Sequence, residues 1–447
     1  MVERNQPLDT AAQAFLNARL VTALKAAALV LAALALGSCG GNSGGGSDGP
    51  VRFLVFGDPP EIRAYRTLID AFGREEPDID VQLVEASDRQ DLLARLSTSF
   101  AGGSPHDVFL LNYRFYGQFA ARGVLDPLAE RLAGSPLFDE RDFYPEALDA
   151  FRWNGELTCL PQNVSSLVVY YNRALFRRYS VPEPTRRWTW NDMVRRALRL
   201  TRDLNGDGDI DQHGLGVEPS IIRLAPFVWS NGGEVVDDDE RPTRFTLDTA
   251  EAEEAMQLFF DLRQVHFVVP SEEEVEAEDD ETRFQNGRLA MVLSSRRATP
   301  TFRTITDFEW DVAPLPVHEQ AAGILHSDAY CMAKASKRKE AAWKFIEFAL
   351  GPQGQRIAAR TGRTVPSLRA IAESPVFLDP AKPPRNSQVF LDTIPVIRRM
   401  PSASTWPEIE DRAEAIIETG LYQGASPEEV ARRLDAATRP IFARAED

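Results

Sequence analysis

Few cysteines, few histidines and fewer basic than acidic residues are the first features of this sequence. Its 447 residues include 3 cysteines and 5 histidines, and no histidines occur at the His-Glu-x-x-His spacing of zinc proteases. No Gly-x-Ser-x-Gly elbow joins a predicted strand to a predicted helix, as it does in serine hydrolases. The formal charge is −17, which argues against nucleic acid and anionic membrane surfaces as partners, because both attract Lys and Arg.

Near the N-terminus, the sequence has the pattern of an export signal. An apolar run from Ala26 to Leu36 follows a basic flank, and it is too short for a transmembrane helix, which needs about 20 residues. The quartet Leu36-Gly37-Ser38-Cys39 resembles the lipobox of bacterial lipoproteins, in which the cysteine thiol receives a diacylglyceryl group. We therefore expect residues 1–38 to be a lipoprotein signal peptide and Cys39 to be lipidated. The alternative is a plain signal peptide that ends near a cysteine.

Length and composition indicate a soluble protein of two α/β lobes. The hydrophobic content of 43% and the charged content of 26% fit a globular protein, and 447 residues exceed one ordinary core. Residues 39–50 are rich in Gly and Ser and predict a lipid-anchored flexible tether. From residue 51 on, strand-like and helix-like segments alternate, which predicts a largely parallel sheet covered by helices. The expected strands include 52–56, 80–84, 107–111 and 167–171, the expected helices include 91–100, 189–202, 251–265 and 339–350, and the acidic run 272–281 is expected to be a surface loop.

Four motifs follow one another along the chain. They are Leu160-Pro161-Gln162-Asn163-Val164-Ser165-Ser166 running into Val168-Val169-Tyr170-Tyr171-Asn172, then Trp229-Ser230-Asn231-Gly232-Gly233, Phe284-Gln285-Asn286-Gly287-Arg288-Leu289-Ala290-Met291 and Ala341-Ala342-Trp343-Lys344-Phe345. In this order they resemble the family 1 extracellular solute-binding proteins, which are the receptors of ABC importers of the maltose-binding type. The resemblance implies a type II periplasmic-binding-protein fold, in which each lobe is a helix-flanked sheet and crossing hinge strands join the two. Lobe one would comprise residues 51–162 plus 328–372, and lobe two residues 163–327 plus 373–447.

What the resemblance implies for function is a monomeric receptor, not an enzyme, that closes on a carbohydrate-type solute and delivers it to the permease of an ABC importer. The protein would be exported and held by its lipid on the outer face of the cytoplasmic membrane or in the periplasm or cell envelope. Two alternatives are a secreted carbohydrate-active hydrolase with two carboxylates and a receptor for ferric ion or another solute on the same fold. Iron is suggested by Tyr170-Tyr171, but neighbours on a strand point to opposite faces.

The candidate ligand-binding residues follow from where such folds bind their ligands. Ligands lie at the carboxyl ends of strands, and their pockets need few, well-placed polar groups. The candidates are Asp58, Asn112, Tyr113, Arg114, Gln162, Asn163, Ser165, Trp229, Asn231, Arg296, Arg297, His326 and Asp328. Trp229 could instead be buried, Asn112–Arg114 could cap a helix, and His326 could be structural. Arg296 and Arg297 could form surface ion pairs, but if they faced the cleft they would favour an anionic sugar, since Arg binds oxyanions bidentately.

Two further features have open alternatives. Asp203, Asn205, Asp207, Asp209 and Asp211 repeat the spacing of the oxygen ligands in an EF-hand calcium loop. Gly214 stands where the bidentate Glu should be, so the loop is either a weak structural calcium site or an Asx-rich turn; no cofactor is otherwise required. Under the two-lobe interpretation, Cys159 and Cys331 flank the hinge crossovers, so they form either a disulfide, which persists in exported proteins, or two buried thiols.

Overall fold

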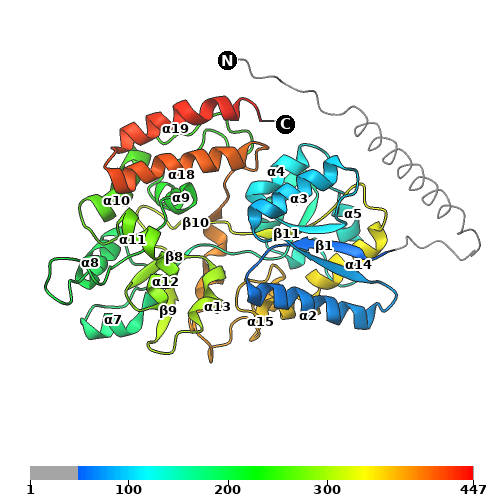
Figure 1. The fold of residues 1–447 in the computed structure, drawn as a ribbon, viewed down its shortest axis with the longest axis horizontal. Coiled ribbons are helices and arrows are strands. Elements are labelled where there is room, and N and C mark those ends of the chain that lie inside the picture. The colour runs from blue at the N-terminus through cyan, green and yellow to red at the C-terminus, as the bar shows by residue number, and fades with distance from the viewer. Residues whose placement is uncertain (1–48, 446–447) are drawn as a thin grey trace, which may run out of the picture. The chain divides into compact units, whose positions relative to one another are not determined.

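The protein has two main sheets, one in each lobe of a mixed α/β fold (Figure 1). The computed structural model describes residues 49–445, so Cys39 and the predicted signal segment lie outside the described part of the chain. The predicted two-lobed fold is confirmed, whereas the residue boundaries of the lobes stay a prediction. We call the part around the five-stranded sheet lobe one and the part around the three-stranded sheet lobe two.

Lobe one is built on a sheet with the strand order β2-β1-β3-β11-β6. Its strands are β1 (Val51–Val55), β2 (Val81–Glu85), β3 (Val108–Asn112), β6 (Cys159–Pro161) and β11 (Asp328–Met332). The first three run parallel, as predicted, but β11 is antiparallel to β3 and β6 is antiparallel to β11. The sheet is therefore mixed, because β6 and β11 carry the chain out of lobe one and back into it rather than through a helical crossover within one lobe.

Helices cover both faces of this sheet because aromatic side chains alternate across its strands. Phe53 of β1 contacts Tyr65 of α2 (Pro59–Glu75) and Phe345 of α14 (Lys339–Leu350), with ring centroids 5.6 and 5.0 Å apart. Phe109 of β3 faces the other way and contacts Phe100 of α3 (Arg89–Ala101) at 5.8 Å. Thus α2 and α14 lie on one side, and α3 and α4 (Tyr113–Ala120) on the other (Figure 1). The shorter elements of the adjoining segments are α5 (Ala129–Ala133), α6 (Pro145–Asp149), β4 (Arg152–Trp153), β5 (Glu156–Leu157), α15 (Pro352–Arg360) and α16 (Arg369–Ala372).

Lobe two is built on an antiparallel sheet. Its central strand β7 (Val168–Asn172) pairs with β8 (Met291–Ser294) on one side and β9 (Trp310–Ala313) on the other. Thr189 and Asp192 form the predicted capping box, and α8 (Trp190–Leu200) begins there. The other helices of this part are α7 (Arg173–Arg178), α9 (Ile221–Ser230), α10 (Ala250–Gln264), α11 (Glu272–Ala277), α12 (Asp280–Gln285), α13 (Thr299–Phe302) and α17 (Gln388–Asp392).

The acidic run 272–281, predicted to be a loop, instead contains α11 and the start of α12. Ser271 forms a capping box with Glu274, and Asp279 accepts a hydrogen bond from the amide of Thr282. Acidic side chains are favourable in the first turn of a helix, where the unpaired amides carry partial positive charge. The charge run was therefore a helix-start signal as well as a mark of exposure.

Several segments cross between the lobes. In the segment after β6, Asn163 forms a bridge with Pro366, and Ser165 forms one with His326. Further along, β10 (Gly323–Ile324) pairs with β12 (Ile397–Arg398). The helix α18 (Trp406–Gln423) then packs on α9, α10 and α19 (Pro427–Phe442) and also contacts α4 of lobe one. In residues 49–445, no helix combines the length and apolarity needed to cross a membrane.

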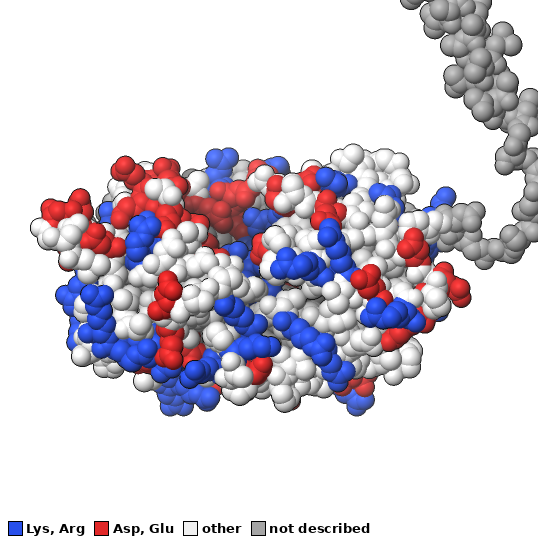
Figure 2. Space-filling model, turned by 60° about the horizontal axis from the view of Figure 1, so that its bottom comes forward, with Lys and Arg blue, Asp and Glu red and all other residues white. Residues whose placement is uncertain are grey.

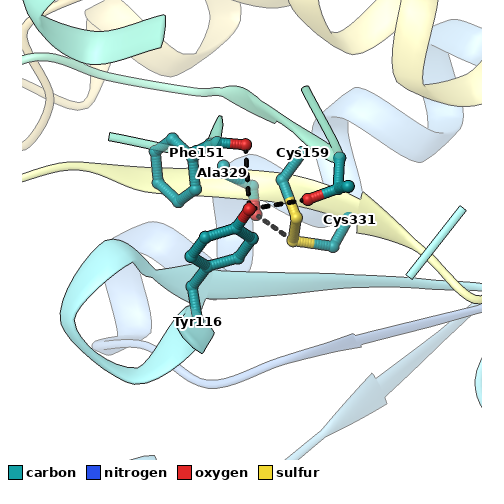
Figure 3. The surroundings of a disulfide bond; sticks show 6 residues. Tyr116, Phe151, Cys159, Ala329 and Cys331 are labelled. Atoms are coloured by element: carbon teal, nitrogen blue, oxygen red, sulfur yellow. Dashed lines mark hydrogen bonds between the residues drawn. A yellow bond between two sulfur atoms is a disulfide. The ribbon is translucent and has the colours of Figure 1, made fainter. Parts of the chain in front are cut away.

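Cys159 and Cys331 form a disulfide between β6 and β11 (Figure 3). The two residues lie directly opposite each other in the antiparallel pair, with Cα atoms 4.4 Å apart. Next to them, the Tyr116 hydroxyl donates to the carbonyl oxygen of Phe151 at 3.0 Å (Figure 3). The disulfide therefore fastens the edge strand β6 at the point where the chain leaves lobe one.

Candidate functional site

A polar cleft of about 440 Å³ lies where the crossing segments meet both lobes. Its lining contains six arginines and four carboxylates. Lobe one and the crossing segments contribute Phe56, Asp58, Glu61, Arg89, Asn112, Arg114, Asn163, Ser165, His326, Asp328, Arg363 and Thr364, and lobe two contributes Glu218, Ile222, Arg223, Ser295, Arg296 and Arg297. Both lobes therefore supply polar groups to one cavity.

Strand ends and helix starts bring the lobe-one residues together. Asp58 follows β1 at the N-cap of α2, and Asn112 ends β3 at the N-cap of α4. The Asn112 amide accepts from the backbone of Arg114 at 3.2 Å and donates to the Asp328 carboxylate at 3.1 Å. Parallel strands end at one edge of a sheet, so their following residues converge there. Asn112 both caps a helix and lines the cleft, so the two interpretations of this residue are compatible.

The crossing segments form the floor of the cleft. The side chain of Asn163 accepts a hydrogen bond from the backbone amide of Asp328 at 2.7 Å, and Ser165 exchanges backbone hydrogen bonds with His326 at 3.0 and 2.8 Å. These contacts join the segment around Asn163 to the segment around Asp328, which is distant from it in the chain. The floor is therefore made of the segments that connect the lobes. Rotation of one lobe relative to the other would change the conformation of these segments.

Ion pairs hold most of the charged residues in the cleft wall. Arg363 pairs with both Asp58 and Glu61, and burial raises the pKa of Glu61 while Arg363 opposes that shift. Arg114 pairs with Glu410 of α18, and both side chains are buried. Arg297 pairs with Glu281 at 2.6 Å. It therefore forms the ion pair that was the alternative to a place in the cleft, and it lines the cleft as well.

Arg296 has no carboxylate partner among the contacts of the described residues. It is fully buried and donates to the carbonyl oxygen of Gly362 at 2.7 Å and to the hydroxyl of Ser387 at 3.2 Å. Its guanidinium carbon also lies over the rings of Phe377 and Phe390, 4.7 and 4.9 Å from their centroids. Burial lowers its pKa to about 9. Its guanidinium is thus held by two π faces, one carbonyl oxygen and one hydroxyl, and no carboxylate among the described residues pairs with its charge.

Four of the predicted ligand-binding residues lie outside the cleft. Tyr113 is buried, and its hydroxyl accepts the amide of Met400 at 3.2 Å. Gln162 is buried beside Tyr65. Trp229 is 1% exposed with Arg398 over its ring at 4.8 Å, and Asn231 caps the end of α9 and donates to the carbonyl oxygen of Glu251 at 2.8 Å. Each follows a strand or ends a helix as expected, but its side chain points into packing rather than into the cavity.

The tyrosine pair that suggested iron is also outside the cleft. The Tyr170 hydroxyl donates to the carbonyl oxygen of Ser295 at 3.0 Å, and the Tyr171 hydroxyl donates to Glu183 at 3.1 Å. The two side chains thus engage different partners, as expected for neighbours on a strand.

Several cleft residues were missed from the sequence. Glu218, Ile222 and Arg223 surround the start of α9, where Pro219-Ser220 comes directly before the helix. Pro219-Ser220 before an apolar run is a helix-start pattern, so the start of α9 could be found in the sequence, although no strand of the described chain lies between α8 and α9 to mark a sheet edge as β3 does at Asn112. Arg363 and Thr364 lie in a stretch between α15 and α16, and no local pattern marks that stretch as part of a cleft.

The calcium-like loop closes on itself through its own side chains. The Asp203 carboxylate accepts from the amides of Gly206 and Gly208 at 2.6 and 2.9 Å, and Asp211 accepts from Leu204 at 2.7 Å. Within residues 49–445, no group of three or more His, Cys, Asp or Glu side chains is arranged to hold a metal ion. Calcium binding by Asp203, Asn205, Asp207, Asp209 and Asp211 stays a prediction.

Two lobes joined by crossing strands around a polar cleft define a solute-binding protein of the periplasmic-binding-protein class. The profile of the family described as bacterial extracellular solute-binding protein matches residues 58–356. The chain belongs to this family. Among curated relatives, it is 23% identical over 380 residues to a binding protein of Brucella abortus, covering 83% of this chain and 87% of that one. It is 22% identical over 325 residues to a maltotriose-binding protein of Pyrococcus abyssi, covering 71% of this chain and 66% of that one.

Among solved structures, an ABC substrate-binding protein of Listeria monocytogenes in complex with cycloalternan is similar throughout the lobes. It superposes with a TM-score of 0.80 at 25% identity, covering 88% of this chain and 99% of that one. The likeness extends over nearly all of the described residues, which agrees with the two-lobed fold.

Proposed function

We propose that this protein is the extracytoplasmic receptor of an ABC importer and that it binds a carbohydrate-type solute between its lobes. The observation that carries the proposal is the cleft itself, whose wall combines residues from both lobes with the strands that connect them. Hydroxyl-rich solutes are held by amide, carboxylate and guanidinium groups such as Asn112, Asp328 and Arg89. The maltotriose and cycloalternan ligands of the similar proteins support a carbohydrate.

The same geometry explains how binding would be signalled. A ligand shifts a two-state equilibrium only by its difference in affinity for the two states. A solute that contacts Asp58 from lobe one and Arg297 from lobe two makes its full set of contacts only when the lobes approach each other. Ligand binding would therefore favour a closed form by hinge motion, which a permease can recognise.

A binding experiment with a matched pair of variants tests this function. Arg89 begins α3, is exposed, and lines the cleft, whereas Arg95 lies on the same helix, pairs with Asp91 at 2.8 Å and is outside the cleft. In calorimetric titrations with mono- and oligosaccharides, polyols and sugar derivatives, Arg89→Ala should weaken binding roughly tenfold. Arg95→Ala should leave it unchanged.

Product analysis of the same incubations separates a receptor from a hydrolase. A receptor returns the solute intact after long incubation, while a glycosidase releases shorter sugars. If the whole panel is silent and ferric ion or an amino acid stabilises the protein instead, the carbohydrate proposal is wrong.

We also propose that Cys39 anchors the protein to a membrane by lipid. The lipobox resemblance and the Gly- and Ser-rich residues 40–50 support this. Cells that express the full-length chain should incorporate labelled palmitate into it and retain it in the membrane fraction. A Cys39→Ser variant should lose both the label and the membrane association; retention of the label would contradict the anchor.

A further inference from the structure

Arg223 is a buried arginine whose hydrogen-bonding capacity is only partly used. It lies in the first turn of α9, is 5% exposed, and lines the cleft. One terminal nitrogen pairs with Glu218 at 2.8 Å. Its Nε and its other terminal nitrogen Nη1 are buried without a hydrogen-bond partner. Buried donors left unsatisfied are strongly unfavourable, so these two nitrogens indicate an acceptor that arrives from outside the chain.

His326 presents a second unpaired atom to the same cleft. Its Nε2 is buried without a partner, and its backbone is held by the bridge to Ser165. Burial, and then the charges of Arg223, Arg114 and Arg297, lower the pKa of His326 well below its usual range. Three guanidinium groups from both lobes therefore lie near one neutral ring, which as the Nε2–H tautomer would donate a hydrogen bond.

Helix α9 adds its N-terminus to this cluster. The helix has ten residues, and its N-cap Ser220 makes no side-chain capping bond. Ile222, in the first turn, lines the cleft. The first amides of a helix have no intrahelical acceptor, and with the helix dipole they form a favourable environment for an anion.

The cleft offers little for an uncharged sugar ring to stack on. Among the described residues that line it, Phe56 is the sole aromatic side chain.

Figure 2 shows acidic side chains gathered on the upper left of one face and continuing into its hollow. Arginines outnumber carboxylates in the cleft lining even though the whole chain carries a formal charge of −17. Within this lining, Nε and Nη1 of Arg223 are the guanidinium nitrogens that are buried without a hydrogen-bond partner among the described residues.

We propose that the cleft binds its solute through an anionic oxygen group, seated on Arg223 and His326 at the N-terminus of α9. The inference rests on the proposed receptor function and narrows its substrate class to carbohydrate derivatives that carry a carboxylate, phosphate or sulfate. Nη1 of Arg223 would donate a charge-assisted hydrogen bond to the oxyanion, next to the Nη2 that pairs with Glu218.

Small inorganic anions test the subsite without knowledge of the whole solute. Thermal melts of the wild type with inorganic phosphate or sulfate, at an ionic strength matched with sodium chloride, should show stabilisation that saturates with anion concentration. Arg223→Met keeps the length of the side chain and removes its charge, and we expect it to weaken this binding at least about tenfold. Arg223→Lys should fall in between, and Arg195→Met, on the exposed surface of α8, should behave like the wild type. If the wild type shows no saturable shift, or if Arg223→Met responds like the wild type, the subsite is overturned.

Matched sugars then identify the kind of anion. Glucose 6-phosphate and glucose form one pair, and glucuronate and glucose form the other, each titrated into wild type and Arg223→Met. We expect the charged member of one pair to bind and the variant to lose that preference. Which pair responds distinguishes a phosphate from a carboxylate.

The two proposals fail in different ways. If neutral oligosaccharides bind tightly and equally to wild type and Arg223→Met, the receptor function stands and the anionic subsite is wrong. If only non-carbohydrate anions bind, the subsite stands and the carbohydrate assignment fails.

Discussion

The buried ion pair between Arg114 of α4 and Glu410 of α18 should be the most sensitive contact between the lobes. Their side chains are 7% and 5% exposed, and the Trp406 indole donates to the second carboxylate oxygen of Glu410 at 3.0 Å. Glu410→Gln keeps the shape of the side chain but leaves the Arg114 charge buried without its partner. Removing one member of a buried pair costs about 3–5 kcal/mol, so we expect a loss of that size in the free energy of unfolding.

Glu414, one turn further along α18, modifies this expectation in a pH-dependent way. Burial and the nearby charge of Glu410 raise its pKa to about 7, and Arg114 opposes them. A carboxyl with a raised pKa binds its proton more tightly in the folded protein, so its contribution to stability is present at low pH and is lost as pH rises through about 7. Without Glu410, the Glu414 carboxylate ionises more readily and becomes available to Arg114. The loss caused by Glu410→Gln should therefore be smaller at about pH 8 than at about pH 5.5.

Denaturant unfolding at both pH values checks this reasoning with matched variants. Measured against Glu414→Gln, the double variant Glu410→Gln/Glu414→Gln should show the full loss at either pH. Arg114→Met/Glu410→Met should recover most of it, because a buried pair replaced by apolar side chains is often neutral. Glu408 also lies on α18, and Glu408→Gln, which breaks its exposed pair with Arg444 beyond the end of α19, should cost less than about 1 kcal/mol. The argument is refuted if Glu410→Gln costs no more than Glu408→Gln, or if the double Met variant is as unstable as the single one.

Three further predictions concern the disulfide, a buried carboxyl and a close helix contact. Reduction of Cys159–Cys331, which closes a loop over a sequence separation of 172, should destabilise the protein by up to about 5 kcal/mol; dithiothreitol should lower the melting temperature of the wild type but not that of the double Ser variant. Burial, and then repulsion by Glu218, raise the pKa of Asp280 to about 7, so the stability it contributes is present at acid pH and lost as pH rises to 7 and beyond. At about pH 8, Asp280→Asn should therefore raise the free energy of unfolding by up to about 4 kcal/mol, seen as a higher melting temperature. At about pH 4 it should have little effect, and an equal effect at both pH values would contradict this. Gly117→Ala would put a Cβ 1.7 Å from the carbonyl oxygen of Ser402 and should lower the free energy of unfolding by about 3 kcal/mol in denaturant unfolding. Gly73→Ala, also in a helix but with open space around it, should raise it by about 0.5–1 kcal/mol. Similar values for the two variants would show that α4 can move away from the 400–403 segment.

Much of the secondary structure could be predicted because its causes lie close together in the chain. The capping box of Thr189 and Asp192 begins α8 where the sequence placed it, and α14 runs over Lys339–Leu350 as its apolar spacing predicts. The acidic run 272–281 was misjudged because charge was interpreted as exposure, although Ser271 three residues before Glu274 is itself a helix-start pattern. Strand direction in lobe one was only partly predictable, since β11 comes from a distant part of the chain.

The residues of the candidate site could also be predicted only in part from the sequence. Asn112 and Asp58 could be located because residues that follow parallel strands collect at one sheet edge. Tyr113 also follows a parallel strand, yet it is buried. Trp229, near the end of α9, is buried as well, because the direction of a side chain depends on what packs against the element from elsewhere.

The sequence by itself determined the alternation of strands and helices, the order of the family motifs and the excess of acid. Only the tertiary structure decided that Arg223 is buried in the cleft with two unpaired nitrogens, and that Cys159 lies opposite Cys331. The physical reason is that periodicity, capping and charge act between residues a few positions apart, whereas a cleft is made where residues far apart in the chain bring their side chains to one place.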